Sequence, residues 1–326
     1  MFTVVIPLYN KAHILVRTLV SVLTQTYAEF EVVIVNDGST DNWEEAISIF
    51  SHDTRIRIIN QYNQGVSAAR NKGVECARYE YIAFLDADDE WLPGYLQKMR
   101  EAIELFPSAG MYGCPSWHRN IMTGQAGNAI LNRYKDKIQT IEYFENPQTM
   151  PHISATVVAK SIFNQIDNGN GFPVGKKLCE DWSCFNRLAF LAPYVYVGYS
   201  LAIRNNGVDG QITGLARTEQ IKMMQYVVDF FNLTHEFSLN YPEKQRLFTI
   251  FFKYDVRNRI LCQLRDNDHS TLQFLLSKLN PACLNEFSAF ELKLYRIQNL
   301  NILAKIYIYI TKLVWRSHGF PIVGRN

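Results

Sequence analysis

The chain has 326 residues, with 33 Lys and Arg against 31 Asp and Glu, and 48% of its residues are hydrophobic. This length suffices for a large core and two domains. The excess of basic residues falls in an apolar tail, which argues against a nucleic-acid role. Six cysteines form neither a Cys-x-x-Cys pair nor zinc-finger spacing, so we expect reduced packing residues. No basic leader precedes the first apolar run, and no apolar stretch is long enough to cross a membrane, so we expect a cytoplasmic protein.

Two apolar runs near the amino terminus each end in polar residues. Residues 3–8 (TVVIPL) predict a buried strand closed by a turn, and a segment with helical apolar spacing follows. Residues 30–35 (FEVVIV) predict a second strand. The polar, turn-forming segment NDGSTD at 36–41 comes next and is able to cap the following helix. Each run therefore predicts a strand followed by a helix.

Two more strand and helix pairs follow. Residues 56–60 predict a third strand, which leads through Gly65 into a helix around residues 67–73, and residues 81–85 predict a fourth strand. Four such units in under a hundred residues predict an α/β fold with a parallel, doubly wound sheet. In such sheets the ligand lies beyond the carboxyl ends of the strands.

The fourth strand runs directly into three carboxylates, Asp86, Asp88 and Asp89. If the strand continues, Asp86 and Asp88 point the same way, because alternate residues share a face. Their oxygens can then bind one hard divalent cation that bridges a diphosphate. The alternative is an acidic cap on a helix that begins near Trp91, since carboxylates also stabilise helix amino termini.

Five motifs together resemble those of family 2 glycosyltransferases of the GT-A fold. They are VVIPLYN at 4–10, VVIVNDGSTD at 32–41, NQGVSAARNKG at 63–73, AFLDADD at 83–89 and GFPVGKKLCEDWSCFNRLA at 171–189. The resemblance implies a GT-A domain over residues 1–215, which leaves residues 216–326 as a helical C-terminal region. It also implies a nucleotide-sugar donor, usually a UDP-sugar, with Mn²⁺ or Mg²⁺, and inversion at the anomeric carbon.

Each motif then suggests roles for its residues. Pro7 and Tyr9 would form the floor and wall of a nucleobase pocket, because an aromatic ring offers a flat stacking surface. Asp37 would accept the imide N–H of uracil, and Arg70 would contact the base or the diphosphate. The alternatives are that Tyr9 packs in the core, that Asp37 caps the following helix, and that Arg70 lies in solvent. The predicted nucleotide-binding set is Pro7, Tyr9, Asn10, Asp37, Arg70, Asp86, Ala87 and Asp88, with Asp86 and Asp88 as metal ligands.

The segment Glu180-Asp181-Trp182 forms a second chemical centre. An inverting transfer needs one base opposite the leaving diphosphate, placed to take the proton of the acceptor hydroxyl. The family resemblance assigns that role to Asp181. Glu180 would orient acceptor hydroxyls and Trp182 would stack on a sugar face, so both are predicted acceptor-binding residues. The alternative is that Glu180 and Asp181 only cap the helix that follows.

Two features depart from the family pattern. Many relatives carry a histidine after the last sheet segment that completes the metal shell, but residues 203–210 (IRNNGVDG) contain none. Asn205, Asn206 or Asp209 can substitute as an oxygen ligand, or the aspartates and the diphosphate can hold Mg²⁺ or Mn²⁺ alone. The Gln-x-x-Arg-Trp motif of processive synthases is also missing, which favours the addition of a single sugar.

The last hundred residues carry an excess of positive charge. Residues 221–326 hold 14 Lys and Arg against 8 Asp and Glu, and no acidic residue follows Glu291. Apolar residues recur there at helical spacing: Leu303, Ile306, Ile310 and Leu313. Basic residues are expected on the opposing side: Lys305, Lys312 and Arg316. Such a helix suits an anionic membrane surface, and the alternative is a helical bundle packed on the catalytic domain.

These observations predict a metal-dependent, inverting glycosyltransferase, cytoplasmic and peripheral on the inner face of the cell membrane. We expect it to move one hexose or N-acetylhexosamine to a saccharide, or to a polyprenyl-diphosphate-linked saccharide, in surface-polysaccharide synthesis. We expect residues 111–160, including Trp117, His118, His152 and Ser154, to face the donor sugar.

Three other functions are alternatives to this prediction. An inactive nucleotide-binding or sugar-binding module of the same fold is disfavoured by the intact carboxylates Asp86, Asp88 and Asp181. A nucleotidylyltransferase should show a Gly-rich basic loop after its first strand, where this chain has Pro7-Leu8-Tyr9-Asn10. A dinucleotide-dependent oxidoreductase is excluded, because no Gly-x-Gly-x-x-Gly follows any strand.

Overall fold

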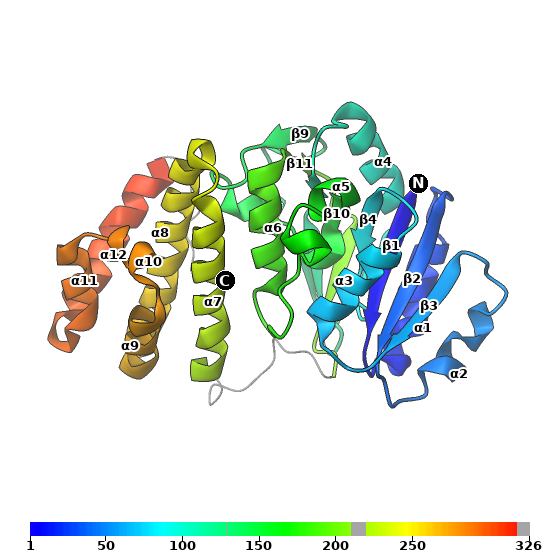
Figure 1. Cartoon of the computed structure of the whole chain (residues 1–326), viewed down its shortest axis with the longest axis horizontal. Helices are drawn as coiled ribbons and strands as arrows, with labels where there is room; N and C mark the ends of the chain where they lie inside the picture. Colours follow the sequence, from blue (N-terminus) through cyan, green and yellow to red (C-terminus); the bar gives the residue numbers. More distant parts are fainter. Residues whose placement is uncertain (129, 210–219, 318–326) are drawn as a thin grey trace. The chain divides into compact units, whose positions relative to one another are not determined.

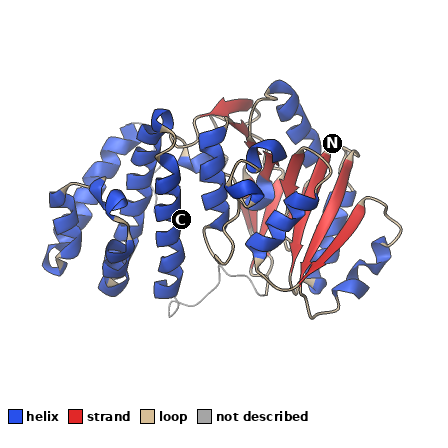
Figure 2. Cartoon of the chain, viewed as in Figure 1, coloured by secondary structure: helices blue, strands red, loops and turns tan. Residues whose placement is uncertain are grey.

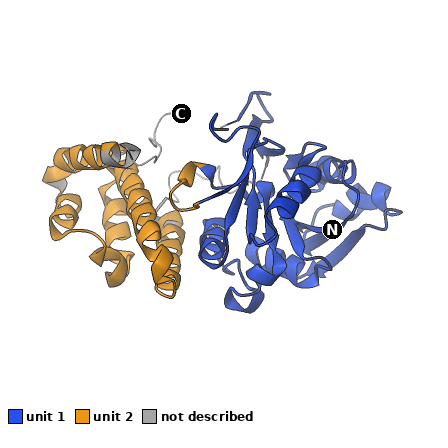
Figure 3. Cartoon of the chain, turned by 90° about the horizontal axis from the view of Figure 1, so that it is seen from above, with its two compact units in different colours: residues 1–141, 149–214 blue, residues 142–148, 215–326 orange. Residues whose placement is uncertain are grey.

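The computed structural model describes residues 1–128, 130–209 and 220–317. The chain divides into two compact units, shown in Figure 3. The first comprises residues 1–141 and 149–214, and the second comprises residues 142–148 and 215–326. The predicted boundary, after residue 215, is one residue from the division after residue 214. Nothing in the sequence indicated that the short segment 142–148 belongs to the second unit.

An eight-stranded sheet forms the centre of the first unit (Figures 1 and 2), in the order β3-β2-β1-β4-β10-β6-β11-β9. Four neighbouring strands are parallel: β1 (Phe2–Leu8), β2 (Phe30–Asp37), β3 (Ile56–Gln61) and β4 (Tyr81–Phe84). The other four are β6 (Met111–Gly113), β9 (Ile138–Ile141), β10 (Thr156–Ala159) and β11 (Tyr194–Val197). The predicted α/β fold and its four parallel strands are thus confirmed.

Helices cover both faces of the parallel strands, which explains why β1 and β2 are buried at every position. On one face, α1 (Ala12–Leu23) packs Leu15, Leu19 and Val22 into the main core, beside α4 (Tyr95–Leu105). On the other face lies α3 (Val66–Cys76), where a Cβ on Gly73 would stand 2.2 Å from Cγ1 of Val5. The first unit also contains α2 (Trp43–Ile47), α5 (Lys160–Phe163) and α6 (Glu180–Leu191).

A smaller sheet lies beyond the carboxyl end of β4, in the order β5-β12-β7-β8. Its strands are β5 (Glu90–Trp91), β12 (Ala202–Asn206), β7 (Ser116–Asn120) and β8 (Ala126–Asn128). Because Glu90 and Trp91 pair antiparallel with β12, and the next helix begins only at Tyr95, the alternative of an acidic helix cap at residues 88–90 is wrong. The pairing brings β12 alongside the acidic loop.

The polar segment after β2 caps a different helix from the expected one. Asp41 accepts a hydrogen bond from the backbone N–H of Ala12, at the start of α1, across 2.8 Å. The following helix, α2, has no side-chain cap at Asn42. The reason is that β1 and β2 are parallel neighbours, so the loops after them meet at one edge of the sheet. The expectation that residues 36–41 cap the following helix was therefore wrong.

The second unit is helical, as predicted for the C-terminal region. Its helices are α7 (Gln220–Ser238), α8 (Pro242–Arg265), α9 (His269–Lys278), α10 (Pro281–Asn285), α11 (Ala289–Arg296) and α12 (Asn301–Ser317). Phe144, from the short segment 142–148, packs its ring against Phe248 and Phe251 of α8. Within the described ranges, every helix is too short or too polar to cross a bilayer.

Candidate functional site

The parallel strands β1, β2, β3 and β4 all end at one edge of the sheet, and the predicted motifs follow them there. Pro7 is buried within β1, whereas Tyr9, just beyond the strand, is 49% exposed. The exposed ring excludes the alternative of a packed Tyr9. Asn10 has a φ of 51°, and its side-chain oxygen accepts a hydrogen bond from the N–H of Thr40 across 2.8 Å. Asn10 thus ties the loop after β1 to the loop after β2.

Asp37 lies at the end of β2 and is only 3% exposed. Its Oδ1 accepts hydrogen bonds from the backbone N–H of Gln64 across 2.8 Å and from Nε2 of Gln61 across 2.7 Å. Its Oδ2 accepts from the N–H of Gly65, also across 2.8 Å. A carboxylate has about four acceptor positions, so three donors leave it room for one more. Asp37 therefore shapes the loop before α3 and does not cap α2.

Arg70 joins two motifs that are far apart in the sequence. Its Nη2 donates to Oδ1 of Asp86 across 2.7 Å, and its Nη1 donates to Glu180 across 3.0 Å. The side chain is 3% exposed and its guanidinium lies 5.4 Å from the ring of Phe172. Burial lowers the pKa of Arg70, but Asp86 and Glu180 outweigh this and raise it above its usual value. Arg70 is therefore a buried, charged bridge and not a solvated side chain.

Asp86 itself is partly exposed, at 25% of its side chain. Burial is the largest influence and raises the pKa of this carboxyl, but the charge of Arg70 and smaller contributions from His152 and Arg204 together outweigh burial and hold the pKa below its usual value. Asp86 is therefore ionised at neutral pH. By contrast, the neighbouring Ala87 is buried in the main core, and its carbonyl accepts from the hydroxyl of Thr18 across 2.8 Å.

Asp86, Asp89 and His152 form a cluster in which one potential ligand atom from each lies within 4.8 Å of the others. His152 reaches this cluster because β10 runs antiparallel to β4, so the residues that precede β10 lie at the carboxyl end of β4. Asp89 is buried and accepts from Oγ of Ser154 across 2.6 Å and from the N–H of Asn205 across 2.9 Å. Asn205 of β12 thus ties the smaller sheet to Asp89 of this cluster.

The charges of the cluster favour a cation. Burial, and then the charges of Asp86 and Asp88, raise the pKa of Asp89 well above its usual value. Burial and the nearby Arg204 lower the pKa of His152 to about 3, so its imidazole is neutral at neutral pH. A neutral imidazole beside carboxylates is a donor set that suits Mn²⁺ and other divalent metals. The residues present therefore fit a metal ion.

Asp88, the second predicted metal ligand, is not a member of this cluster. Its carboxylate lies 3.1 Å from Nζ of Lys11, and its carbonyl accepts from Nδ2 of Asn205 across 2.7 Å. Lys11 also donates to the carbonyl of Asp209 across 2.6 Å. Of the three expected substitutes for the missing histidine, Asn205 is fully buried and its side-chain oxygen accepts from Arg119. Asn205 is thus a structural link between the acidic loop and β12.

Glu180, Asp181 and Trp182 begin α6, and all three are half-buried. The residue before them, Cys179, has a φ of 60° and makes no side-chain cap. Oδ1 of Asp181 accepts from the N–H of Trp182 across 2.8 Å. Burial and the adjacent Glu180 raise the pKa of Asp181 to about 7, although Arg70 opposes the rise. A carboxyl that titrates near neutral pH can take a proton from a hydroxyl group.

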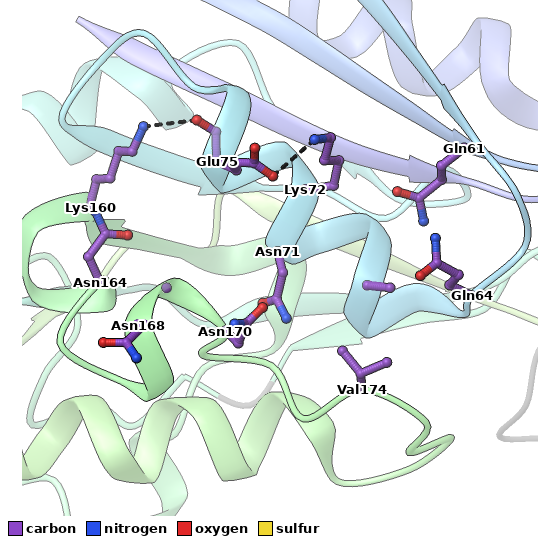
Figure 4. A pocket seen from close by; sticks show the side chains of 12 residues that line it. Gln61, Gln64, Asn71, Lys72, Glu75, Lys160, Asn164, Asn168, Asn170 and Val174 are labelled. Carbon is purple, nitrogen blue, oxygen red and sulfur yellow. Dashed lines mark hydrogen bonds and ion pairs between the residues drawn. The ribbon is translucent and has the colours of Figure 1, made fainter.

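A separate pocket of about 720 Å³ lies against α3 (Figure 4). Amide side chains dominate its wall: Gln61, Gln64, Asn71, Asn164, Asn168 and Asn170. Its two lysines are engaged: Lys72 pairs with Glu75 across 3.0 Å, and Lys160 donates to the carbonyl of Ala77 across 2.8 Å. The pocket contains none of the predicted site residues, so it is distinct from the carboxylate cluster.

The sequence analysis mentioned Asp89 and His152 but did not predict that either would join Asp86 in a possible metal site. Asp89 belongs to the acidic run, and His152 was expected to face the donor sugar. The available signal was a histidine just before the apolar segment 156–159 (TVVA). Nothing in the local pattern says that this strand pairs antiparallel with β4.

Comparison with known proteins agrees with these motifs. Residues 3–163 match the family described as Glycosyl transferase family 2. The uncharacterized glycosyltransferase alr2836 of Nostoc is 41% identical over 246 residues, which are 70% of this chain and 74% of that protein. The uncharacterized glycosyltransferase YibD of Escherichia coli is 44% identical over 92 residues, or 28% of this chain and 27% of YibD. An uncharacterized glycosyltransferase of Rickettsia felis is 47% identical over 87 residues, which are 27% of this chain and 14% of the Rickettsia protein.

Solved structures resemble nearly the whole chain, and one of them illustrates the likeness. The crystal structure of S. aureus TarS 1-349 in complex with UDP-GlcNAc has a TM-score of 0.67 and covers 98% of this chain and 93% of that chain. The sequence identity is 15%. At that identity the likeness establishes the fold, and it confirms the predicted GT-A architecture with its C-terminal helices.

Proposed function

The chain belongs to glycosyltransferase family 2, and from this premise we propose that it transfers one hexose or N-acetylhexosamine from a nucleotide sugar to a saccharide acceptor. The acceptor is free or linked to a lipid such as a polyprenyl diphosphate, and the product enters surface polysaccharide. The anomeric carbon is inverted, because one displacement by the acceptor hydroxyl expels the diphosphate. UDP is the nucleotide to test first, since the solved TarS structure contains UDP-GlcNAc.

The bridge made by Arg70 is the observation that carries this proposal. It brings Asp86 of the acidic loop and Glu180 of α6 to one guanidinium, although they come from motifs 94 residues apart in the sequence. A donor diphosphate near Asp86 would therefore lie close to the residue after Glu180, which is Asp181. A single displacement needs leaving group and base in one site, on opposite sides of the reacting carbon.

We place a divalent cation, Mn²⁺ or Mg²⁺, at Asp86, the residue shared by the predicted pair of Asp86 and Asp88 and by the cluster of Asp86, Asp89 and His152. When bound, such an ion neutralises charge on the leaving diphosphate. Asp89 has both oxygens engaged by Ser154 and Asn205, and its Oδ2 lies 3.6 Å from Nδ1 of His152. Nδ1 of His152 accepts a hydrogen bond from the backbone N–H of Ser154 across 3.4 Å, so the backbone at Ser154 orients the imidazole.

We assign the general base to Asp181. Its pKa of about 7 lets the carboxylate be present at neutral pH and still hold a proton once it has taken one. Glu180 keeps Arg70 in place, and Trp182 offers an aromatic face to the acceptor. On the donor side, the exposed ring of Tyr9 stacks on the nucleobase, and Asp37 uses its remaining acceptor position for the imide N–H.

A donor-hydrolysis screen tests the proposal. The protein would be incubated with UDP-, GDP- and dTDP-sugars, each with Mn²⁺, with Mg²⁺ or with EDTA, and nucleotide release would be measured. We expect release from a UDP-sugar only when metal is present. Asp53→Asn is a suitable control variant, because Asp53 forms a surface pair with Arg55.

The same screen separates the enzyme from its main rival. An inactive module of the same fold would bind UDP in calorimetry yet release no nucleotide from any donor, with or without acceptor. That result would refute the proposed transfer.

A further inference from the structure

The last described helix, α12, carries a row of large apolar side chains in contact with solvent. Each is between 49% and 74% exposed: Ile302, Leu303, Ile306, Tyr309, Ile310 and Leu313. Phe290, on the neighbouring helix α11, is 63% exposed and its ring lies 6.1 Å from that of Tyr307. Contiguous exposed apolar groups of this kind mark interaction surfaces, whereas single ones are ordinary.

These six residues lie on one side of the helix. Successive helical residues turn by about 100°, which puts all six within an arc of about 120°. Ala304 and Ile308, which are fully buried, lie on the opposite side. The two expectations for this segment are therefore compatible: α12 packs on α8 and α11 along one side and presents the other side outward.

A buried ionic contact holds α12 in this orientation. Glu291 of α11 is 1% exposed and accepts from Arg257 of α8 at both oxygens, across 2.5 and 2.9 Å. The hydroxyl of Tyr307 on α12 donates to the same carboxylate across 3.5 Å. Because three helices share one buried carboxylate, their packing fixes which side of α12 faces outward.

The described charged side chains of α11 and α12 are basic, apart from the buried Glu291. Glu291 is the last acidic residue in the sequence, and its charge is buried and paired with Arg257. Lys293 and Arg296 at the end of α11 are exposed, and Lys305 is half-buried. The helical register places Lys305 beside the apolar face instead of opposite to it. The side chains of Lys312 and Arg316 lie outside the described residues.

We propose that the outward face of α12, together with Phe290, docks on an anionic phospholipid bilayer. A helix of 17 residues is about 25 Å long and can lie in the interface, with its apolar side chains among the acyl chains. Lys293, Arg296 and Lys305 then meet the negative headgroups. Tyr309 has an apolar ring and a polar hydroxyl, which suits the headgroup level.

A second copy of the chain is the main rival occupant. Two such faces placed together would bring like charges at Lys293, Arg296 and Lys305 towards each other, with no acidic residue after Glu291 to offset them. An anionic bilayer supplies the opposite charge along the whole helix. Charge complementarity therefore favours the bilayer.

Vesicle flotation tests the inference on the full chain, with vesicles of phosphatidylcholine alone or mixed with phosphatidylglycerol. We expect flotation with the mixed vesicles and little with phosphatidylcholine. The double variant Ile306→Gln with Ile310→Gln should reduce partitioning by about tenfold or more, because it removes two apolar side chains that the bilayer would bury. The control variant Ile49→Gln with Leu105→Gln changes side chains that are 67% and 62% exposed in the first unit, and should float like the wild type.

Two further measurements keep the result interpretable. The melting temperature of the α12 variant should stay near that of the wild type, since the changed side chains are exposed. Light scattering should show the same mass for both. Absence of flotation with anionic vesicles, or equal flotation of the α12 variant, would overturn the inference. The inference would also be overturned if light scattering showed that the wild type is a dimer and the α12 variant a monomer. Flotation needs no sugar donor, so this test is independent of the proposed transferase activity.

Discussion

Nη2 of Arg70 lies 2.7 Å from Oδ1 of Asp86, and this contact links α3 to the loop after β4 inside the candidate site. The same guanidinium also reaches Glu180. Three carboxylates thus depend on one buried cation, since the charge of Arg70 also lowers the pKa of Asp181. The electrostatics of the acidic loop after β4 and of the start of α6 are therefore coupled through a single side chain.

Arg70→Gln should destabilise the protein by about 3–5 kcal/mol at pH 7.5, because it leaves the largely buried carboxylates of Asp86 and Glu180 without their cation. The matched change Arg55→Gln breaks a pair whose side chains are 32% and 23% exposed, and should cost less than about 1 kcal/mol. Urea denaturation of both variants measures the difference. The loss at Arg70 should shrink at low pH, where the carboxylates take up protons. Equal losses for the two variants would contradict the bridging role.

Metal-dependent nucleotide binding should require Asp86. Calorimetry of UDP binding in Mn²⁺ and in EDTA should show tighter binding with metal, and Asp86→Asn should remove that difference, with a loss of about 10–100-fold. Asp88→Asn and His152→Gln should weaken the metal effect in the same way. If Asp89→Asn abolishes it while Asp88→Asn does not, the ligand set is Asp86, Asp89 and His152. Equal affinity of the wild type in Mn²⁺ and EDTA would sink the metal assignment.

Asp181→Asn should preserve donor affinity and lower turnover by about 10²–10⁴-fold, the usual span for loss of a general base. Asn keeps the shape of the side chain and can still accept from the N–H of Trp182, so folding is little affected. If the variant keeps near-normal turnover with acceptor present, the base is another carboxylate, and Glu180→Gln becomes the next variant to measure.

The pH dependence follows from the raised pKa of Asp181. The base must be ionised, so wild-type turnover should fall about tenfold per pH unit below a pKa of about 7. The folded state holds this proton more tightly than the unfolded chain, so stability should decrease as the pH rises from about 4 to about 7. Asp181→Asn should remove this contribution and be more stable than the wild type at pH 8. Activity profiles and denaturation at several pH values test both signs.

Gly73→Ala should destabilise the protein by about 1–3 kcal/mol, because the added Cβ would meet Cγ1 of Val5 at 2.2 Å in the core. This cost exceeds the gain in helix propensity of about 1 kcal/mol. Gly127→Ala is the control, since a Cβ there has no neighbour within 4 Å. Thermal unfolding of both variants decides the point. An unchanged melting temperature for Gly73→Ala would show that α3 can move away from the sheet without loss.

The amino-acid sequence by itself determined the order of strands and helices over the first hundred residues, the GT-A family motifs and the helical nature of the C-terminal region. These features depend on apolar spacing and turn residues within a few positions of each other, which local patterns express directly. Local reasoning pointed to Asp37 and Asp86, and the family resemblance added the roles expected of Arg70 and Asp181.

Only the tertiary structure decided which side chains meet. His152 joins Asp86 because β10 pairs antiparallel with β4, and Asn205 reaches Asp89 because β12 pairs with β5. Asp41 caps α1 because two parallel strands end side by side. The outward face of α12 likewise follows from packing on α8 and α11. In each case the deciding contacts join segments distant in the chain, and their formation depends on the packing of whole elements, which local spacing does not encode.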